Sequence, residues 1–186
     1  KGIYPMALGS QYTTLDATIS VASANSYATI AEADDYHDGR VSTYTADWTG
    51  AATEIKEDAL MEATRLLDLY VAWNGTKSDI TFTSGIPDQP LAWPRSGVVG
   101  PEGETWPATV IPVWLKIATA ELARSIIAKE RTKEPIRGID RIKTGEVEID
   151  FDTIRHEKIL VRTVRSMVAP YGKIKEGGLT RRIARV

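Results

Sequence analysis

Hydrophobic residues recur at three- and four-residue spacing along several stretches of this 186-residue chain, most clearly between residues 53 and 72. Seven apolar positions there share one stripe of a helix: Ile55, Ala59, Leu60, Ala63, Leu66, Leu67 and Tyr70. The charged residues of the stretch lie mostly off that stripe, and Asn74-Gly75 follows as a stop signal. This pattern predicts an amphipathic helix with its apolar side in the core.

A shorter helix is indicated just before it. Thr29 and Glu32 have the spacing of a capping box, in which each side chain accepts a hydrogen bond from the backbone amide of the other residue. Ile30 and Ala33 would then face inward, and Gly39 would end the helix. Between the two helices the sequence suggests only a polar link that contains Trp48.

Residues 74–112 form a connection that carries six of the nine prolines. The six are Pro87, Pro90, Pro94, Pro101, Pro107 and Pro112. Each proline removes an amide donor and restricts the residue before it, so the segment cannot be a regular helix. Leu91, Trp93 and Trp106 make it too apolar for a linker that stays in water, and long loops in compact domains are usually functional. We expect an ordered connection, pinned by its tryptophans to the helices or to a neighbouring subunit.

Two more helices are predicted in the C-terminal half. Pro112 suits the first position of a helix over residues 113–131, where its missing amide costs nothing. The apolar residues of this helix cover more than one narrow stripe, which indicates a central position: Trp114, Leu115, Ile117, Ala118, Leu122, Ile126 and Ile127. The last helix is expected over residues 153–169, ending before Pro170. Its inward residues would be Ile159, Leu160, Val164, Met167 and Val168.

Between these two helices the hydrophobic period becomes that of a strand. Val147, Ile149 and Phe151 alternate with acidic residues, which is typical of a half-buried strand. Thr144-Gly145 supplies a turn, so residues 139–143 and 146–151 are predicted to form a β-hairpin. A single hairpin is marginally stable in water, and we expect this one to pack on helices or on another subunit.

Together these elements predict a mainly α protein: a four-helix core with a long Pro/Trp-rich loop, one β-hairpin at about 139–151, and extended N- and C-terminal arms. We divide the chain into an arm at 1–24, a helical domain at 25–170 and a basic arm at 171–186. A hydrophobic share of 42% with 26% charged residues fits one globular domain. No apolar run approaches the roughly 20 residues that cross a bilayer. Residues 1–16 lack the layout of a secretory signal, and the absence of cysteine excludes disulfides and thiolate chemistry.

The net charge of −2 conceals an uneven distribution. Residues 1–100 carry 6 Lys/Arg against 13 Asp/Glu, whereas residues 101–186 carry 17 against 12. Such a distribution suits head-to-tail association or contact with an acidic partner. After Gly177-Gly178 the C-terminus mixes apolar residues with arginines, so this segment is a candidate for adding to the sheet edge of another protein. A solvated, disordered tail is the alternative.

We nominate no residue for catalysis, for cofactor binding or for metal binding. His37 and His156 each lie near a predicted helix end without a recognisable partner. Asp34, Asp35 and His37 fall within one turn and do not make a coordination set. Glycine-rich phosphate loops, GxSxG turns and HExxH helices are absent from the sequence. The pattern therefore favours a protein that is not an enzyme.

Binding of single-stranded DNA is a second functional alternative. It would require a basic groove with aromatic side chains on which bases stack. Trp93, Arg95, Trp106 and the C-terminal arginines are the residues available for such a groove. The acidic first hundred residues argue against a strong nucleic-acid binder, and tryptophans beside prolines are more often packing anchors.

Several segments resemble phage proteins described as DnaT-like single-stranded-DNA-binding. These segments are Ser26-Tyr-Ala-Thr-Ile-Ala-Glu-Ala-Asp-Asp-Tyr, Ala63-Thr-Arg-Leu-Leu-Asp, Gln89-Pro-Leu-Ala-Trp-Pro-Arg-Ser-Gly, Ile111-Pro, and the Ala-Thr-Ala-Glu-Leu-Ala helix. The resemblance extends from about residue 25 to the basic C-terminus, and its most specific element is the stretch that begins at Leu91. The architecture is also similar to that of head–tail adaptor (connector) proteins of tailed phages.

The resemblance to adaptors implies a structural subunit of the virion, assembled in the host cytoplasm into a homo-oligomeric ring, commonly of twelve. The ring would lie beneath the phage portal protein at the head–tail junction and join it to a tail or tail-completion protein. DNA would pass through the channel without sequence-specific binding, and neither a membrane nor a cofactor is implied. The family description implies the alternative, a single-stranded-DNA-binding accessory protein of phage replication.

The same resemblance implies roles for three groups of residues. The C-terminal arm would bind the portal through Leu179, Arg181, Arg182, Ile183, Arg185 and Val186. The loop would hold neighbouring subunits together through Leu91, Trp93, Arg95 and Trp106. The hairpin tip would face the lumen or the tail with Lys143, Thr144, Gly145 and Glu146.

Overall fold

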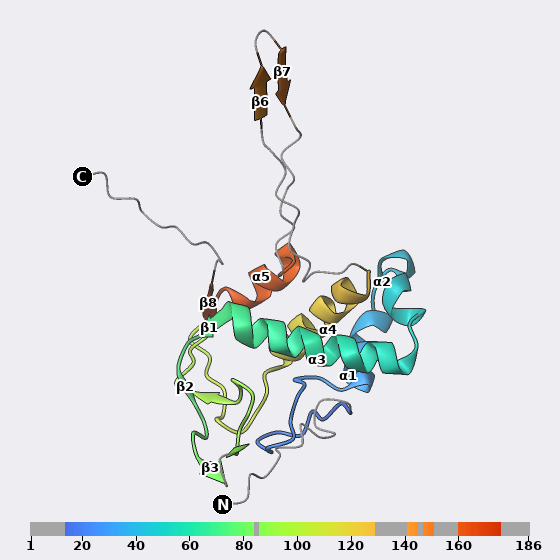
Figure 1. Ribbon diagram of the computed structural model, residues 1–186. Coiled ribbons are helices and arrows are strands. Elements are labelled where there is room, and N and C mark those ends of the chain that lie inside the picture. Colours follow the sequence, from blue (N-terminus) through green and yellow to red (C-terminus); the bar gives the residue numbers. More distant parts are fainter. Residues whose placement is uncertain (1–13, 84–85, 129–140, 145–146, 151–159, 176–186) are drawn as a thin grey trace, which may run out of the picture.

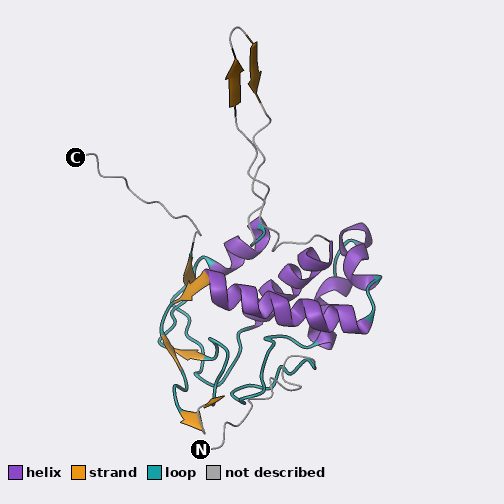
Figure 2. Ribbon diagram, in the orientation of Figure 1, coloured by secondary structure: helices purple, strands orange, loops and turns teal. Residues whose placement is uncertain are grey.

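The computed structural model describes residues 14–83, 86–128, 141–144, 147–150 and 160–175 (Figures 1 and 2). Over these residues the protein is mainly α, with five helices. The helices are α1 (Ile30–Asp38), α2 (Ser42–Thr49), α3 (Thr53–Tyr70), α4 (Val113–Ala128) and α5 (Arg162–Val168). The strands are β1 (Val71–Trp73), β2 (Thr76–Lys77), β3 (Phe82–Thr83), β4 (Ile86–Pro87), β5 (Arg95–Ser96), β6 (Arg141–Thr144), β7 (Val147–Asp150) and β8 (Gly172–Ile174). No helix in these ranges has the length and apolar character that a membrane span requires.

Helices α3 and α4 lie side by side at the centre of the helical body (Figure 1). Helix α4 also contacts α1, α2 and α5, which confirms the central position predicted from its broad apolar surface. Leu60, Leu66 and Leu67 of α3 are fully buried together with Leu115 and Leu122 of α4. At ~1.5–3 kcal/mol for each buried large side chain, this contact is a principal source of stability.

The stripe predicted for α3 is confirmed along most of the helix but not at its first turn. Ala59, Leu60 and Ala63 are buried as expected. Ile55 was expected to face the core, yet it is 49% exposed. It lies in the first turn of α3, one turn before Ala59, the first buried residue of the helix.

Helix α1 begins and ends as its sequence predicts. The Thr29 hydroxyl accepts a hydrogen bond from the Glu32 amide, and the Glu32 carboxylate accepts one from the Thr29 amide. Both bonds satisfy amides that a helix start otherwise leaves unpaired. Gly39 is the C-cap, and its amide donates to the carbonyl of His37.

Helix α2 was not predicted, so the predicted four-helix core is not confirmed. The segment expected to be a polar link forms two helical turns with Trp48 fully buried. No side chain caps its start, and only Thr45 and Trp48 are buried along it. A helix held by one large aromatic residue leaves little hydrophobic periodicity to recognise.

The described residues of the connection 74–112 contain no helix, as its prolines predict, but they form strand pairs that were not predicted. Strand β2 pairs with β5 and β3 pairs with β4, each over two residues. Strand β1 continues directly from α3 and pairs antiparallel with β8, with Ala72 opposite Lys173. The chain thus returns to the C-terminal end of α3 just before residue 176.

The predicted β-hairpin forms, with a register that moves its turn by one residue. Thr144 is the antiparallel partner of Val147, so Thr144 belongs to the strand and not to the turn. The last helix also differs from its prediction, because Val161 is extended and α5 begins only at Arg162. Its end before Pro170 is confirmed, and residues 153–159 lie outside the described part of the chain.

Candidate functional site

The stretch 89–97, the most distinctive segment of the sequence, lies against the C-terminal end of α3. Gln89 is buried, and its side-chain amide donates to the carbonyls of Leu91 and Pro94 at 3.1 and 2.9 Å. Its carbonyl accepts a hydrogen bond from the Asp79 amide at 3.0 Å. The proline-rich backbone supplies few donors of its own, so one buried amide side chain organises the turn.

Asp68 fastens this loop to α3. Its carboxylate accepts hydrogen bonds from the Tyr27 hydroxyl at 2.5 Å, the Ala92 amide at 2.9 Å and the Trp73 indole at 3.2 Å. The Tyr27 oxygen in turn accepts a hydrogen bond from the Trp93 amide at 3.2 Å. Desolvation raises the pKa of Asp68 in spite of these donors, and desolvation beside Asp68 raises the pKa of Tyr27.

Arg95 is hydrogen-bonded to the backbone of its own chain. Its guanidinium donates to the carbonyls of Asn74 at 2.7 Å, Gly75 at 2.6 Å and Ala92 at 3.1 Å. The planar fork of arginine suits three carbonyls that converge in this way. Arg95 therefore fixes the junction between β1, β2 and the loop, with three of its five N–H donors bound to backbone carbonyls.

The tryptophans of this region form one aromatic cluster inside the chain. Trp93 packs edge to face on Trp73 and on Trp114, with ring centroids 6.0 and 5.5 Å apart. Tyr171 stacks on Trp114 at 3.9 Å and meets Trp106 edge to face at 5.2 Å. The cluster joins the loop to α4 and to the chain just before β8. Of the two expectations for these tryptophans, packing on the helices is the one observed.

The loop residues predicted for a subunit interface have different exposures. Trp93 is 1% exposed and has no free surface. Leu91 and Trp106 are half-buried and pack against the core. A contact of this loop with a neighbouring subunit therefore remains a prediction that rests on Leu91 and Trp106.

A second polar network surrounds Glu121, a fully buried residue of α4. Its carboxylate accepts a hydrogen bond from the Tyr44 hydroxyl and forms ion pairs with Arg40 at 3.5 Å and Arg124 at 3.2 Å. Both guanidinium groups lie over the Tyr44 ring, at 4.6 and 4.0 Å from its centroid. Every partner comes from α1, α2 or the loop between them, or from α4, so the network fixes these helices to one another.

Asp34 and His37 of α1 have hydrogen-bond partners within the helical body. Asp34 accepts hydrogen bonds from the Trp48 indole at 2.8 Å and from Lys56 at 2.9 Å. These bonds outweigh the effect of burial and lower the pKa of Asp34. His37 is buried beside Trp48, and desolvation lowers its pKa. Within the described residues, no group of acidic or histidine side chains is arranged to hold a metal ion.

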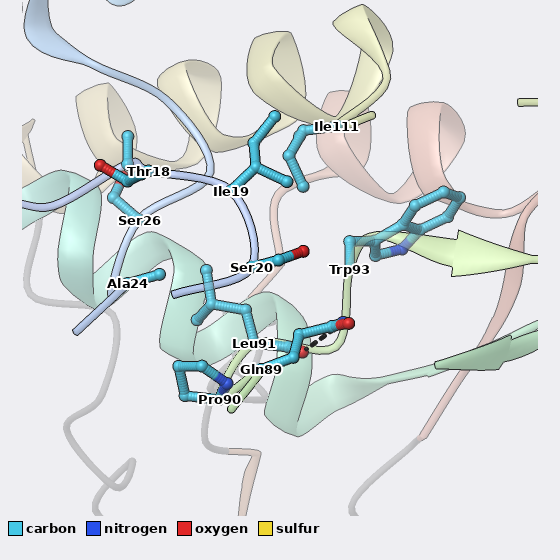
Figure 3. Close-up of a pocket in the computed structure, with 11 residues that line it drawn as sticks. Thr18, Ile19, Ser20, Ala24, Ser26, Gln89, Pro90, Leu91, Trp93 and Ile111 are labelled. Carbon is cyan, nitrogen blue, oxygen red and sulfur yellow. Dashed lines mark hydrogen bonds between the residues drawn. The ribbon is translucent and has the colours of Figure 1, made fainter. Parts of the chain in front are cut away.

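A small hollow lies between residues 17–26 and the start of the loop (Figure 3). Ile19 and Ile111 lie along one side of it, and the Gln89 amide donates to Leu91 within it. Its empty volume is about 220 Å³ including space open to solvent, whereas ligand pockets hold ~300–1,000 Å³. We assign no ligand to it.

The exposed charges separate toward the two ends of α3. Between residues 30 and 58, all fully exposed charged residues are acidic: Asp35, Asp38, Asp47, Glu54 and Asp58. In residues 59–75 and 160–175, all exposed charged residues are basic: Arg65, Arg162, Lys173 and Lys175. The connection between these ranges adds two exposed acidic residues, Glu102 and Glu104. Figure 1 places α1, α2 and the start of α3 at one end, and the end of α3 with β1, β8 and α5 at the other. The two ends are the candidate assembly surfaces.

The remaining predicted site residues fall largely outside the described ranges. The proposed portal-binding residues, all between 179 and 186, lie in the segment 176–186, which the structure does not describe. Lys143 and Thr144 belong to strand β6, while Gly145 and Glu146 also lie outside the described residues. Lys175 is the last described residue before the arm, and it donates to the carbonyls of Tyr70 and Leu69 at the end of α3.

Sequence reasoning missed Tyr27, Asp68 and Glu121 as organising residues. Tyr27 and Asp68 are hydrogen-bonded although they are 41 residues apart in the sequence, and Tyr44 and Glu121 are hydrogen-bonded at a separation of 77 residues. The one available signal was an acidic residue within an apolar helix, as at Glu121, because buried carboxylates need partners.

Comparison with known proteins gives one family. A family model described as "Putative DnaT-like ssDNA binding protein" matches residues 14–186. No curated protein matches the chain, and no solved structure does.

Proposed function

The chain belongs to the family described as putative DnaT-like ssDNA binding proteins, and within it we propose a structural role: a head–tail adaptor (connector) subunit of a tailed phage. In this role the chain assembles into a homo-oligomeric ring of about twelve copies beneath the portal protein, a number taken from the resemblance to adaptors. The ring joins the portal to a tail or tail-completion protein, and DNA passes through its channel without sequence-specific binding. The family description does not state this role, which is our own inference.

The observation that carries the proposal is the separation of exposed charge to opposite ends of α3. A chain with an acidic end and a basic end is complementary to further copies of itself. Repetition of one such heterologous contact produces a ring when its rotation closes.

The inward packing of the aromatic residues is consistent with a structural role. Within the described residues no tryptophan is fully exposed, and Arg95 is bound to three backbone carbonyls. Base stacking needs accessible aromatic faces beside free cations. The most distinctive stretch of the chain therefore stabilises a scaffold.

Binding to the portal protein encoded in the same genome is the experiment that tests the proposal. Full-length chain should be retained by immobilised portal rings, and a chain lacking residues 177–186 should lose most of that retention. Glu102→Lys, which changes an exposed charge in a loop, is a matched control and should bind like the wild type. Retention that is unaffected by the deletion would contradict portal docking through the arm.

Single-stranded DNA binding is the second candidate, because the family description names it. The exposed cations Arg162 and Lys173, with the C-terminal arginines, would supply phosphate contacts. This candidate predicts salt-sensitive affinity that falls when Arg181, Arg182 and Arg185 are replaced by alanine. A gel shift of an oligonucleotide at moderate salt distinguishes it from the adaptor.

A further inference from the structure

The basic end of the molecule carries a specific surface at the β1–β8 sheet. Lys173 in β8 and Lys175, which directly follows the strand, are both exposed. The Lys175 amide donates to the Tyr70 carbonyl beside β1, so the extended pairing continues to this residue and places it two positions from Lys173, on the same face. Ala72, the partner of Lys173 across the sheet, is exposed on the neighbouring strand. Leu69 lies in the last turn of α3, two residues before β1, and it is 50% exposed. We call Leu69, Ala72, Lys173 and Lys175 the basic face.

The basic face has the composition of a protein interface. Two exposed apolar residues, Leu69 and Ala72, lie near two cations: Ala72 is opposite Lys173 across the sheet, and the Lys175 ammonium donates to the Leu69 carbonyl. Interfaces between proteins combine an apolar centre with a polar rim in this way. On the opposite face of the same sheet Val71 is buried. Only one side of the sheet is therefore exposed in the manner of the basic face.

The other end of α3 carries a surface of the opposite sign. Glu54 and Asp58 are one helical turn apart and both exposed, so they lie on one side of the helix. Ile55 beside them is 49% exposed, although it belongs to an otherwise buried stripe. We call Glu54, Ile55 and Asp58 the acidic face. It repeats the composition of the basic face, with an exposed apolar residue next to two like charges.

We propose that the basic face of one copy docks on the acidic face of a second copy, and that this contact is the repeated subunit interface of the assembly. That the contact repeats around a ring depends on the proposed function, whereas the contact itself is inferred from the two faces. Complementary charge accelerates association and fixes its register, while Leu69 and Ile55 supply apolar area. Because the faces differ, the contact is heterologous and leaves one face of each kind free at the ends of an open chain.

A charge swap tests this contact directly. Lys173→Glu reverses the basic face and Asp58→Lys reverses the acidic face. Lys175 and Glu54 stay unchanged, because Lys175 donates to the last carbonyls of α3 and Glu54 lies in its first turn, where each interacts favourably with the helix dipole. Self-association is followed by sedimentation velocity at about 50 mM salt, where charge screening is weak. Each single variant should associate about tenfold more weakly than the wild type, with unchanged circular dichroism.

Restoration is the decisive arm of the experiment. An equimolar mixture of the two single variants should recover association, because each reversed face then meets a complementary face on the other chain. The chain that carries both substitutions should recover it as well, as a double-mutant cycle requires of interacting residues. Glu102→Lys, away from both faces, should behave as the wild type.

Three results would overturn the proposal: single variants that associate like the wild type, a mixture that does not recover, and a wild-type chain that stays monomeric at millimolar concentration. Recovered assemblies that stop at two copies would overturn the head-to-tail arrangement. The proposed function can fail separately. If the charge-swapped variants behave as expected but the chain does not bind the portal, the adaptor role is contradicted and this contact is still supported. Single variants that still form the wild-type ring on the portal remove only this contact.

Discussion

At the scale of single residues, two carboxylates organise most of the polar interior that the structure describes. Asp68 connects Tyr27 near the start of the described chain, Trp73 in β1 and the backbone of the Pro/Trp-rich loop. Glu121 does the same for α1, α2 and α4. Each carboxylate has several partners at different sequence separations, so the loss of one donor leaves the others around a poorly solvated charge.

Tyr27→Phe tests the Asp68 network. It removes a donor to Asp68 and the acceptor of the Trp93 amide, and both groups are then left short of a partner inside the protein. We expect the free energy of unfolding to fall by about 1–3 kcal/mol in urea denaturation. Tyr171→Phe is the matched control, because it keeps the ring that stacks on Trp114, and it should change stability by less than ~0.5 kcal/mol.

The titration of Asp68 should make the free energy of unfolding depend on pH. Its pKa is raised by desolvation, so the folded protein holds the proton more tightly than the unfolded chain does. The stabilisation that this proton provides is complete below the aspartate pKa of the unfolded chain and is lost as the pH rises through the raised pKa. Asp68→Asn cannot titrate, and the corresponding decline in the free energy of unfolding should disappear from its pH profile. An unchanged profile would mean that Asp68 is solvated.

At the scale of elements, features that depend on neighbouring residues could be predicted from the sequence, whereas features that depend on contacts between distant residues could not. The capping box of α1 was predictable because both of its residues lie within one turn, and so was the end of α5 before Pro170. Helix α2 was missed because Trp48 finds its partners in α1 and α3, beyond any local pattern. Ile55 was placed in the core because its spacing continues the apolar stripe, and periodicity alone does not show which turns of a helix are buried. For the candidate surfaces, the uneven charge distribution was visible in the residue order, whereas the pairing of β8 with β1 needed the three-dimensional fold.

Gly172→Ala tests the pairing that brings the C-terminal segment to α3. A β-carbon at Gly172 would lie 2.7 Å from Val71 Cγ1 and 2.9 Å from the Ala72 carbonyl oxygen, both on the opposite strand. We expect β8 to separate from β1, and the amides of Asn74 and Lys175 to lose protection from hydrogen exchange. Gly39→Ala, where the nearest atom is 4.0 Å away, is the control and should leave these amides protected.

Thr29→Ala tests the capping box. The variant loses the acceptor for the Glu32 amide at the start of α1. Replacement of such a cap typically lowers the free energy of unfolding by about 1 kcal/mol, and thermal denaturation should show the loss. Thr49→Ala, at the far end of α2, leaves every helix start intact and should cost less. Equal losses from the two variants would contradict the importance of the cap.

At the scale of the whole molecule, the account describes a rigid helical scaffold with unlike ends. The residues that could have lined a binding groove pack instead in the aromatic cluster and in the two carboxylate networks. The surface that remains is acidic around α1, α2 and the start of α3, and basic around β8 and α5. Such a distribution favours assembly with further copies, and it gives the basic C-terminal residues a fixed point of departure beside α3.

The adaptor account predicts weak and nonspecific interaction with single-stranded DNA. At about 0.15 M salt, attraction between exposed charges that are more than ~8 Å apart is largely screened. We therefore expect no gel shift of an oligonucleotide at micromolar protein, and no difference when Arg181, Arg182 and Arg185 are replaced. A salt-sensitive shift that these substitutions abolish would favour the accessory role in replication.

The most direct test of the central claim is the mass of the purified chain, alone and mixed with its portal protein, measured by light scattering. We expect the dilute chain alone to be a monomer or a loose oligomer that grows with concentration, and the mixture to contain a closed ring of defined mass bound to the portal. A chain that leaves the mass of the portal unchanged, and shifts single-stranded DNA at moderate salt, would contradict the adaptor role.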